Sequence, residues 1–242
     1  MVERHGFRSL KLKAGVFDPD VEIDTVLQLA QTFPEHLLRL DPNTAWTVET
    51  SIEVGRRLRH HLDYLEDPTP GATSMALVGQ ATGLPIATNM LVTHFEDVPE
   101  AIAEGAIQIL LSDHHYWGGL RATQHVASLC SVWDIGVSKH SNSHLGISLV
   151  AMAHVACATP NLGFACDTHY PWLEEDVIVG GLLSFEAGAL RVPTSPGLGV
   201  KLDPVALERM HRQYLDTPIR SRNDASQMQK YDPSWTGSLP RF

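Results

Sequence analysis

The sequence has few cysteines and no long apolar segment. Its three cysteines form no C-x-x-C pair, which disfavours a disulfide framework or a zinc site and favours reduced thiols. No apolar run reaches the ~18 to 20 residues that a membrane helix needs, and residues 1–13 lack the hydrophobic core of a signal peptide. We therefore expect a cytoplasmic protein with no membrane partner.

Positive charge is also scarce. The chain has 18 Lys and Arg residues against 28 Asp and Glu residues, a net charge of −10, and its densest basic run is residues 56–59. That run is typical of a solvated helix face, whereas a protein that reads phosphates presents a clustered basic surface. We expect no nucleic-acid partner. Hydrophobic residues make up 43% of the chain, enough to bury a core, which excludes disorder.

The sequence does contain a regular alternation of strand-like and helix-like segments. Residues 9–15 alternate apolar side chains with lysine, a strand pattern, and residues 20–33 carry a helical apolar stripe that ends at Pro34. Further strands are expected at residues 36–41, 62–66, 85–89, 106–113, 135–140 and 163–167. Further helices are expected at residues 47–60, 73–82, 98–104, 120–133 and 146–156.

A polar residue closes each expected strand. These residues recur every 23 to 28 positions and are Lys13, Asp41, Glu66, Asn89, Asp113, His140 and Asp167. A unit of that length is one strand plus one helix, and repeated units build a parallel sheet whose sites gather at the carboxyl ends of the strands. No G-x-G-x-x-G motif follows a strand, which disfavours a doubly wound dinucleotide-binding sheet and favours a (β/α) barrel.

The number of expected strands predicts an α/β fold in the form of an incomplete TIM-type barrel. A closed barrel of this kind has eight strands, whereas the pattern indicates seven. We therefore expect residues 1–215 to form an incomplete (β/α) barrel that lacks its first strand. Residues 216–242 are expected to form a C-terminal tail that packs on the barrel.

Lys11 and Lys13 lie two positions apart and so project from the same face of the first strand. Two ammonium groups side by side in a barrel lumen repel one another and are poorly solvated. Both effects lower the pKa of a lysine and make its neutral amine available as a base. The alternative is an exposed edge strand with a solvated lysine face.

Asp41, Glu66 and Asn89 close three consecutive strands. Three oxygen donors that leave room for water and a substrate carboxylate suit Mg²⁺, which prefers octahedral oxygen ligation. Each residue taken alone also has a structural explanation, as a turn residue or a helix cap.

Asp113 and His140 close the next two expected strands. A carboxylate can accept the proton of one imidazole nitrogen and leave the other nitrogen as a general base, so we interpret them as a catalytic pair. His114 and His115 adjoin Asp113, and the alternative is that this cluster binds a metal.

Seven short motifs resemble those of the glucarate dehydratases of the enolase superfamily, in the same order and over nearly the whole chain. The motifs are residues 10–15, 40–43, 64–68, 87–90, 140–144, 167–169 and 222–225. Members of that superfamily use a Lys or His base with Mg²⁺ to form an enediolate.

The resemblance implies a role for each matched residue. Lys13 would be the base on one face of the substrate carbon, and His140, oriented by Asp113, the base on the other. Lys11 would neutralise the substrate carboxylate, and Mg²⁺ would be held by Asp41, Glu66 and Asn89. Substrate binding is expected from Lys11, Asn43, Asn89, Ser141, Asn142, His169 and Arg222. The implied reaction is dehydration of an aldarate, such as D-glucarate or L-idarate, to 5-keto-4-deoxyglucarate.

The sequence departs from the family pattern at two site positions and at its amino end. Ser143 replaces an asparagine, and Lys139 stands where a small residue is usual. The resemblance also implies an α+β capping domain before the barrel, and we expect this chain to lack it. The alternatives are therefore a catalytically incompetent barrel fragment, one part of a split protein with a complementing N-terminal domain, or another superfamily reaction such as racemisation. Self-association into a homo-oligomer is expected from the open barrel edges.

Overall fold

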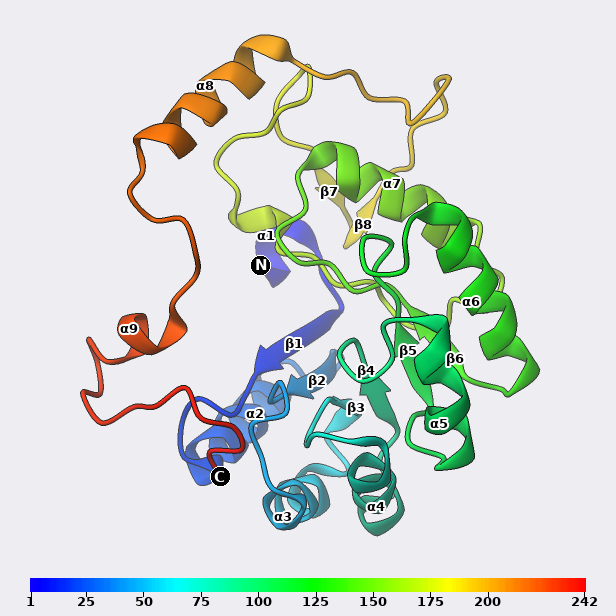
Figure 1. Cartoon of the computed structure of the whole chain (residues 1–242), viewed down its shortest axis with the longest axis vertical. Coiled ribbons are helices and arrows are strands. Elements are labelled where there is room, and N and C mark those ends of the chain that lie inside the picture. The colour runs from blue at the N-terminus through cyan, green and yellow to red at the C-terminus, as the bar shows by residue number, and fades with distance from the viewer.

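A computed structural model describes all residues, 1–242, and its centre is a curled parallel sheet (Figure 1). The six strands lie in chain order, β1-β2-β3-β4-β5-β6, and each pairs in parallel with the next. Their bounds are β1 Ser9–Lys13, β2 Leu37–Asp41, β3 Leu62–Glu66, β4 Ile86–Thr88, β5 Ile109–Leu111 and β6 Gly136–Ser138. The expected incomplete (β/α) barrel is confirmed as a half-barrel.

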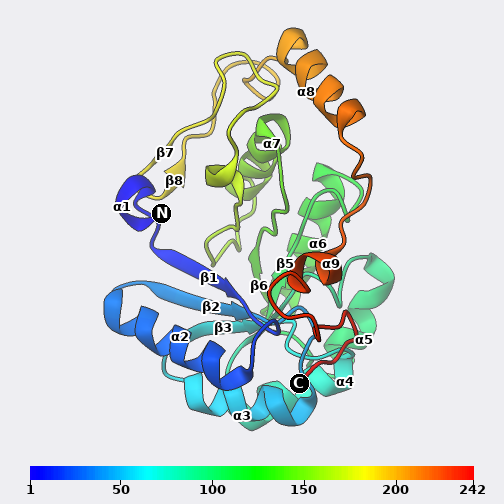
Figure 2. The same cartoon turned by 90° about the vertical axis from the view of Figure 1, so that its left-hand side faces the viewer.

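Helices connect the strands and cover the outer face of the sheet (Figures 1 and 2). They are α2 Pro19–Thr32, α3 Val48–Leu58, α4 Ala72–Thr82, η1 Phe95–Asp97, α5 Val98–Ala103, α6 Leu120–Val132 and α7 Gly146–Cys157. Local chemistry fixes their starts, because the Asp18 carboxylate and the Thr47 hydroxyl accept backbone N–H groups at the first turns of α2 and α3. The main core of 26 buried apolar residues lies between the sheet and these helices.

The seventh expected strand, residues 163–167, is not a strand. Leu162 makes a single parallel bridge to Val137, and the N–H groups of Gly163 and Asp167 donate to carbonyls beside β6 at 3.1 and 2.9 Å. Between them the Ala165 carbonyl accepts side-chain donors from β2 and β6 instead. Residues 163–167 therefore run beside β6 without a continuous ladder of backbone hydrogen bonds, because the Ala165 carbonyl accepts side-chain donors instead of a strand partner.

The half-barrel interior is filled by aromatic and charged side chains. The Phe164 ring meets the Tyr64 ring edge-on at 5.8 Å, and the Arg39 guanidinium lies 4.6 Å above the same Tyr64 ring. Arg39 is 2% exposed and donates to Asp63 and to the Ala165 carbonyl at 3.2 and 2.7 Å. These contacts hold the 163–167 segment across the open side of the sheet.

Six elements lie outside the βα repeat and were not predicted. They are α1 Val2–His5, η2 Tyr170–Trp172, β7 Phe185–Glu186, β8 Ala189–Leu190, α8 Pro204–Asp216 and α9 Asp224–Met228. Strands β7 and β8 form a separate antiparallel pair. None of the helices combines the length and apolar character needed to cross a membrane.

The C-terminal tail returns to the barrel only at its end (Figure 1). Arg241 donates its backbone N–H to the Ala45 carbonyl at 2.7 Å, and Phe242 packs against the main core. Most of the tail before these residues is exposed, including Tyr231 at 78%. The division of the chain at residue 215 stays a prediction.

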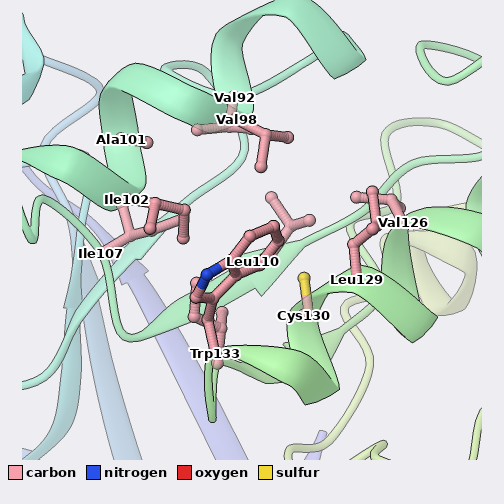
Figure 3. A pocket seen from close by; sticks show the side chains of 11 residues that line it. Val92, Val98, Ala101, Ile102, Ile107, Leu110, Val126, Leu129, Cys130 and Trp133 are labelled. Atoms are coloured by element: carbon pink, nitrogen blue, oxygen red, sulfur yellow. The ribbon is translucent and has the colours of Figure 1, made fainter.

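An apolar pocket lies among α5, α6 and β5, on the outer side of the sheet (Figure 3). All eleven residues that line it are hydrophobic, among them Ile102, Leu110 and Trp133. Because no polar group faces it, this pocket does not suit an acid sugar, and the candidate site lies elsewhere.

Candidate active site at the carboxyl ends of the strands

A lysine surrounded by carboxylates forms the centre of the site. The Lys11 Nζ lies 2.6 Å from Glu66 Oε1, 2.7 Å from Asp167 Oδ2 and 3.2 Å from Asp41 Oδ2. Although burial acts to lower it, these three negative charges raise the pKa of Lys11 well above its ordinary value. The expectation that repulsion lowers this lysine's pKa is therefore wrong, because its nearest charged neighbours are carboxylates.

Lys13 lies beside Lys11 and has a more open environment. Its ammonium group donates to Asp41 Oδ2, while its side chain is 45% exposed. Burial acts to raise the pKa of Asp41, but Lys11 and Lys13 together hold it below its usual range. Lys11 is thus held in its protonated form, and Lys13 is the more exposed of the two lysines.

Glu66 and Asp67 are buried side by side at the end of β3. Burial and the negative charge of Asp41 raise the pKa of Glu66 well above its ordinary value, and the same two causes raise the pKa of Asp67 to about 7. Asp67 accepts the Asn89 backbone N–H at 2.9 Å and the Thr88 hydroxyl, and it positions the β4 end. The site therefore carries more negative charge than its lysines balance.

Asp41, Glu66 and Asn89 fit a magnesium ion by their donor chemistry. Their side chains converge, since the Asn89 amide contacts Glu66 Oε1 and Lys11 lies within 3.2 Å of both carboxylates. Glu66 Oε2 is buried without a hydrogen-bond partner. A hard divalent ion such as Mg²⁺ is bound by oxygen ligands of this kind. The Lys11 ammonium group, which lies against the same two carboxylates, shows that they attract a positive charge.

The histidine pair lies at the ends of β5 and β6. His140 Nδ1 is 3.1 Å from Asp113 Oδ2, and the Tyr116 ring stacks on the imidazole with centroids 5.8 Å apart. Asp113 is 1% exposed. Burial acts to raise the pKa of Asp113, but hydrogen bonds from His140 and the His115 backbone, together with the nearby His144 imidazole, hold it well below its usual range. A carboxylate that stays ionised fixes the imidazole and leaves Nε2 for chemistry.

His169 follows the 163–167 segment, and its ring lies near the Trp172 ring with centroids 5.4 Å apart. Burial lowers the pKa of His169, an effect that the negative charge of Asp167 opposes and the positive charges of Lys13 and Lys11 reinforce.

The other predicted substrate-binding residues are placed differently. Asn43 is half-buried beside Asp41 Oδ1, to which its backbone N–H donates at 2.9 Å, whereas Ser141 is buried and Asn142 exposed next to His140. Arg222 lies outside this group, with its side chain 81% exposed and paired only with Asp224. Its substrate role stays a prediction.

Asp67, Asp167 and His144 belong to the site but were not among the predicted site residues. Asp167 closes an expected strand, and the other two adjoin predicted residues in the motifs Glu66-Asp67 and His140–His144. Its position at the end of an expected strand is the sequence signal that could have identified Asp167 as a site residue. Nothing in the sequence shows that Asp167 bonds Lys11, 156 positions away.

Comparisons with known proteins assign the family. The model of enolase C-terminal domain-like proteins matches residues 1–206. A probable glucarate dehydratase from Streptomyces coelicolor is 54% identical over 243 residues, which cover 99% of this chain and 56% of that relative. Arabinonate dehydratase from Saccharolobus solfataricus is 25% identical over 206 residues, covering 80% of this chain and 52% of the relative.

Solved structures agree with that assignment. An enolase from Pseudomonas fluorescens with bound magnesium, potassium and tartrate has a TM-score of 0.95 and 52% identity, covering 100% of this chain and 57% of that one. An enolase from Mycobacterium smegmatis complexed with tartrate has a TM-score of 0.95 and 51% identity, covering 100% and 58%.

The chain therefore belongs to the enolase superfamily, and its barrel is of the enolase C-terminal type. Within that superfamily it is similar to the acid-sugar dehydratases, as the motif resemblance indicated. The chain spans little more than half the length of the relatives it matches.

Proposed function

We propose that this site dehydrates an acid sugar, an aldarate such as D-glucarate or L-idarate, to 5-keto-4-deoxyglucarate with Mg²⁺ as cofactor. One observation carries the proposal. A reachable lysine at the end of β1 and a carboxylate-oriented histidine after β6 share the carboxyl-end edge of one parallel sheet with a buried cluster of carboxylates, one of whose oxygens has no hydrogen-bond partner.

The first step is removal of the proton α to the substrate carboxylate. This proton is weakly acidic, so the developing enediolate needs positive charge beside it before a base can take the proton. Lys11 supplies that charge, because its neighbours keep it protonated. In its neutral amine form Lys13 takes this proton from the epimer that presents it on one face of the carbon, and the neutral His140 imidazole takes it from the other epimer.

Loss of the β-hydroxyl follows and leaves an enol, which tautomerises to the keto product. His140, held by Asp113 at 3.1 Å, gives a proton to the departing hydroxyl group, which leaves as water. When bound by Asp41, Glu66 and Asn89, Mg²⁺ would add positive charge where the substrate carboxylate lies. The hydroxyl groups of a polyhydroxy acid would be bound by the remaining polar side chains, those of Asn43, Ser141, Asn142 and His169.

The proposal is tested by turnover and by proton exchange. The chain is incubated with D-glucarate, L-idarate or galactarate and Mg²⁺, and the keto-deoxy product is measured by NMR. We expect Lys13→Ala and His140→Ala to lose roughly 10²- to 10⁴-fold in rate, the usual contribution of a general acid or base. His125→Ala, on the exposed side of α6, serves as the matched control and keeps wild-type rates.

Exchange of the α-proton in D₂O separates the two bases. Lys13→Ala should abolish exchange from one epimer and leave exchange from the other, and His140→Ala should do the opposite. Mg²⁺ is expected to raise the thermal unfolding temperature of the wild type, and Glu66→Gln should remove that increase. Absence of turnover with all three substrates, or unchanged rates in both base variants, would contradict the proposed function.

A further inference from the structure

Three ligand-type side chains meet around the carboxylate that contacts His140. They are Asp113 and His115, from the loop after β5, and His144, from the loop after β6. One ligand atom of each lies within 4.8 Å of the others. His115 Nδ1 is 3.4 Å from Asp113 Oδ1, and His144 Nε2 is 3.5 Å from Asp113 Oδ2. The two imidazoles therefore approach the two oxygens of one carboxylate.

His144 is the member of this group that the protein itself leaves unsatisfied. The residue is 4% exposed, yet neither of its ring nitrogens has a hydrogen-bond partner. Its Nε2 faces Asp113 at 3.5 Å, beyond a good hydrogen bond. A buried imidazole with no partner is costly, so its orientation toward a carboxylate and a second imidazole indicates a ligand.

We propose that Asp113, His115 and His144 form a second metal site, selective for a borderline ion of the Zn²⁺ type. Two imidazoles and one carboxylate are a zinc ligand set, with a fourth position left for water. The predicted magnesium site differs in kind, since its donors are all oxygen. The two sites therefore select different ions by ligand chemistry.

The site can be reached and closed with small movements. The His115 side chain is 52% exposed, and its Nε2 is held by the Ser148 hydroxyl at 2.8 Å, which orients Nδ1 toward Asp113. The three ligand atoms now lie within 4.8 Å of one another. Atoms that bind one zinc ion at about 2.0 to 2.2 Å lie closer together than this, so the separations must shrink by about 1 Å on binding. Rotation of the exposed His115 ring supplies that movement.

Zinc at this site competes with His140 for Asp113. The carboxylate oxygen that accepts from His140 Nδ1 at 3.1 Å also faces His144 at 3.5 Å. An ion drawn to that carboxylate weakens its hold on the His140 ring. We therefore expect Zn²⁺ to inhibit at saturating Mg²⁺. This consequence for turnover rests on the proposed dehydratase function, whereas binding of the ion does not.

The test measures binding of Zn²⁺ by calorimetry, and of Co²⁺ by absorption spectroscopy, in excess Mg²⁺. A Cys157→Ser background removes the exposed thiol. One equivalent should bind, and the Co²⁺ spectrum should lack a thiolate charge-transfer band. His115→Ala and His144→Ala should each weaken binding at least about tenfold, an effect at the lower end of those seen at metal sites. His115 is exposed, so its variant is expected to fold even where the buried His144 variant does not.

Surface histidines provide the control. His60→Ala and His61→Ala, both exposed, should bind zinc as the background protein does. In the active chain, zinc inhibition should disappear in His115→Ala. The proposal is overturned if both cluster variants bind zinc unchanged, if the surface variants abolish binding, or if no zinc binds in excess Mg²⁺. If zinc binds at the cluster in a chain without turnover, this site stands and the proposed function falls.

Discussion

Lys139 is a basic residue buried next to His140 in the chain. It is 1% exposed, and its ammonium group has one hydrogen-bond partner, the Ser112 hydroxyl at 3.1 Å. Burial lowers the pKa of Lys139 to about 8, an effect that nearby Cys166 and Cys130 oppose. A lysine with so few partners costs stability whenever it carries a proton.

This cost predicts a pH-dependent gain in stability for Lys139→Met. The folded-state pKa of Lys139, about 8, lies below its ordinary value of 10.5, so the penalty is full below the folded pKa and disappears as the pH rises through 10.5. We expect the variant to be more stable than the wild type by up to about 3 kcal/mol at pH 7, with the difference vanishing above pH ~10.5. Urea unfolding over this pH range measures it. The exposed Lys201→Met is the control, and a pH-independent difference would contradict the prediction.

At the scale of elements, the segment at residues 163–167 replaces the strand that the sequence pattern predicted. It fills the half-barrel interior through Phe164, which packs directly against the bare backbone of Gly136 on β6. A Cβ atom at Gly136 would lie 2.5 Å from Phe164 Cε2. The close approach of ring and strand is therefore what holds this segment against the sheet.

We expect Gly136→Ala to lower the free energy of unfolding by about 1 to 3 kcal/mol, the usual cost of overpacking. The penalty should shrink in a Phe164→Leu background, which a double-mutant cycle from denaturant unfolding would reveal as a coupling energy. Gly163→Ala is the matched control, because a Cβ there meets nothing within 4 Å. Equal penalties for Gly136→Ala in both backgrounds would show that the ring does not cause the strain.

At the scale of the whole molecule, the half-barrel leaves β1 as an edge strand. It pairs with β2 on one side and with no strand on the other. An edge with unpaired backbone groups is a template for pairing with a second chain. Because the Ala14 N–H donates to β2, the amides of Ser9, Lys11 and Lys13 face the open side by alternation.

We predict that the chain self-associates through this edge. Sedimentation velocity should show an oligomer whose fraction rises with protein concentration, and Ser9→Pro should shift it toward monomer, because proline removes an outward N–H group and blocks strand pairing. Ser226→Ala, at an exposed position on α9 outside this edge, serves as the neutral comparison. An unchanged oligomer in a folded Ser9→Pro variant would place the interface elsewhere.

The repeat of strand and helix could be predicted from the sequence because hydrophobic periodicity and capping are local properties. Asp18, Thr47 and Pro34 mark helix ends through interactions with residues a few positions away. The strand-end positions of Asp41 and Glu66 follow from the same periodicity. The irregular course of residues 163–167 could not be predicted, since it depends on donors from β2 and β6.

The sequence alone was enough to predict the fold class, from its repeat of strand and helix patterns. It was also enough to predict which polar groups stand at the strand ends, including Lys13 and His140. Only the tertiary structure decided their charge states and partners. Lys11 is held protonated by carboxylates 30 to 156 positions away, and His144 meets Asp113 only because two loops converge. A pKa depends on burial and on nearby charge, and both are set by the folded chain.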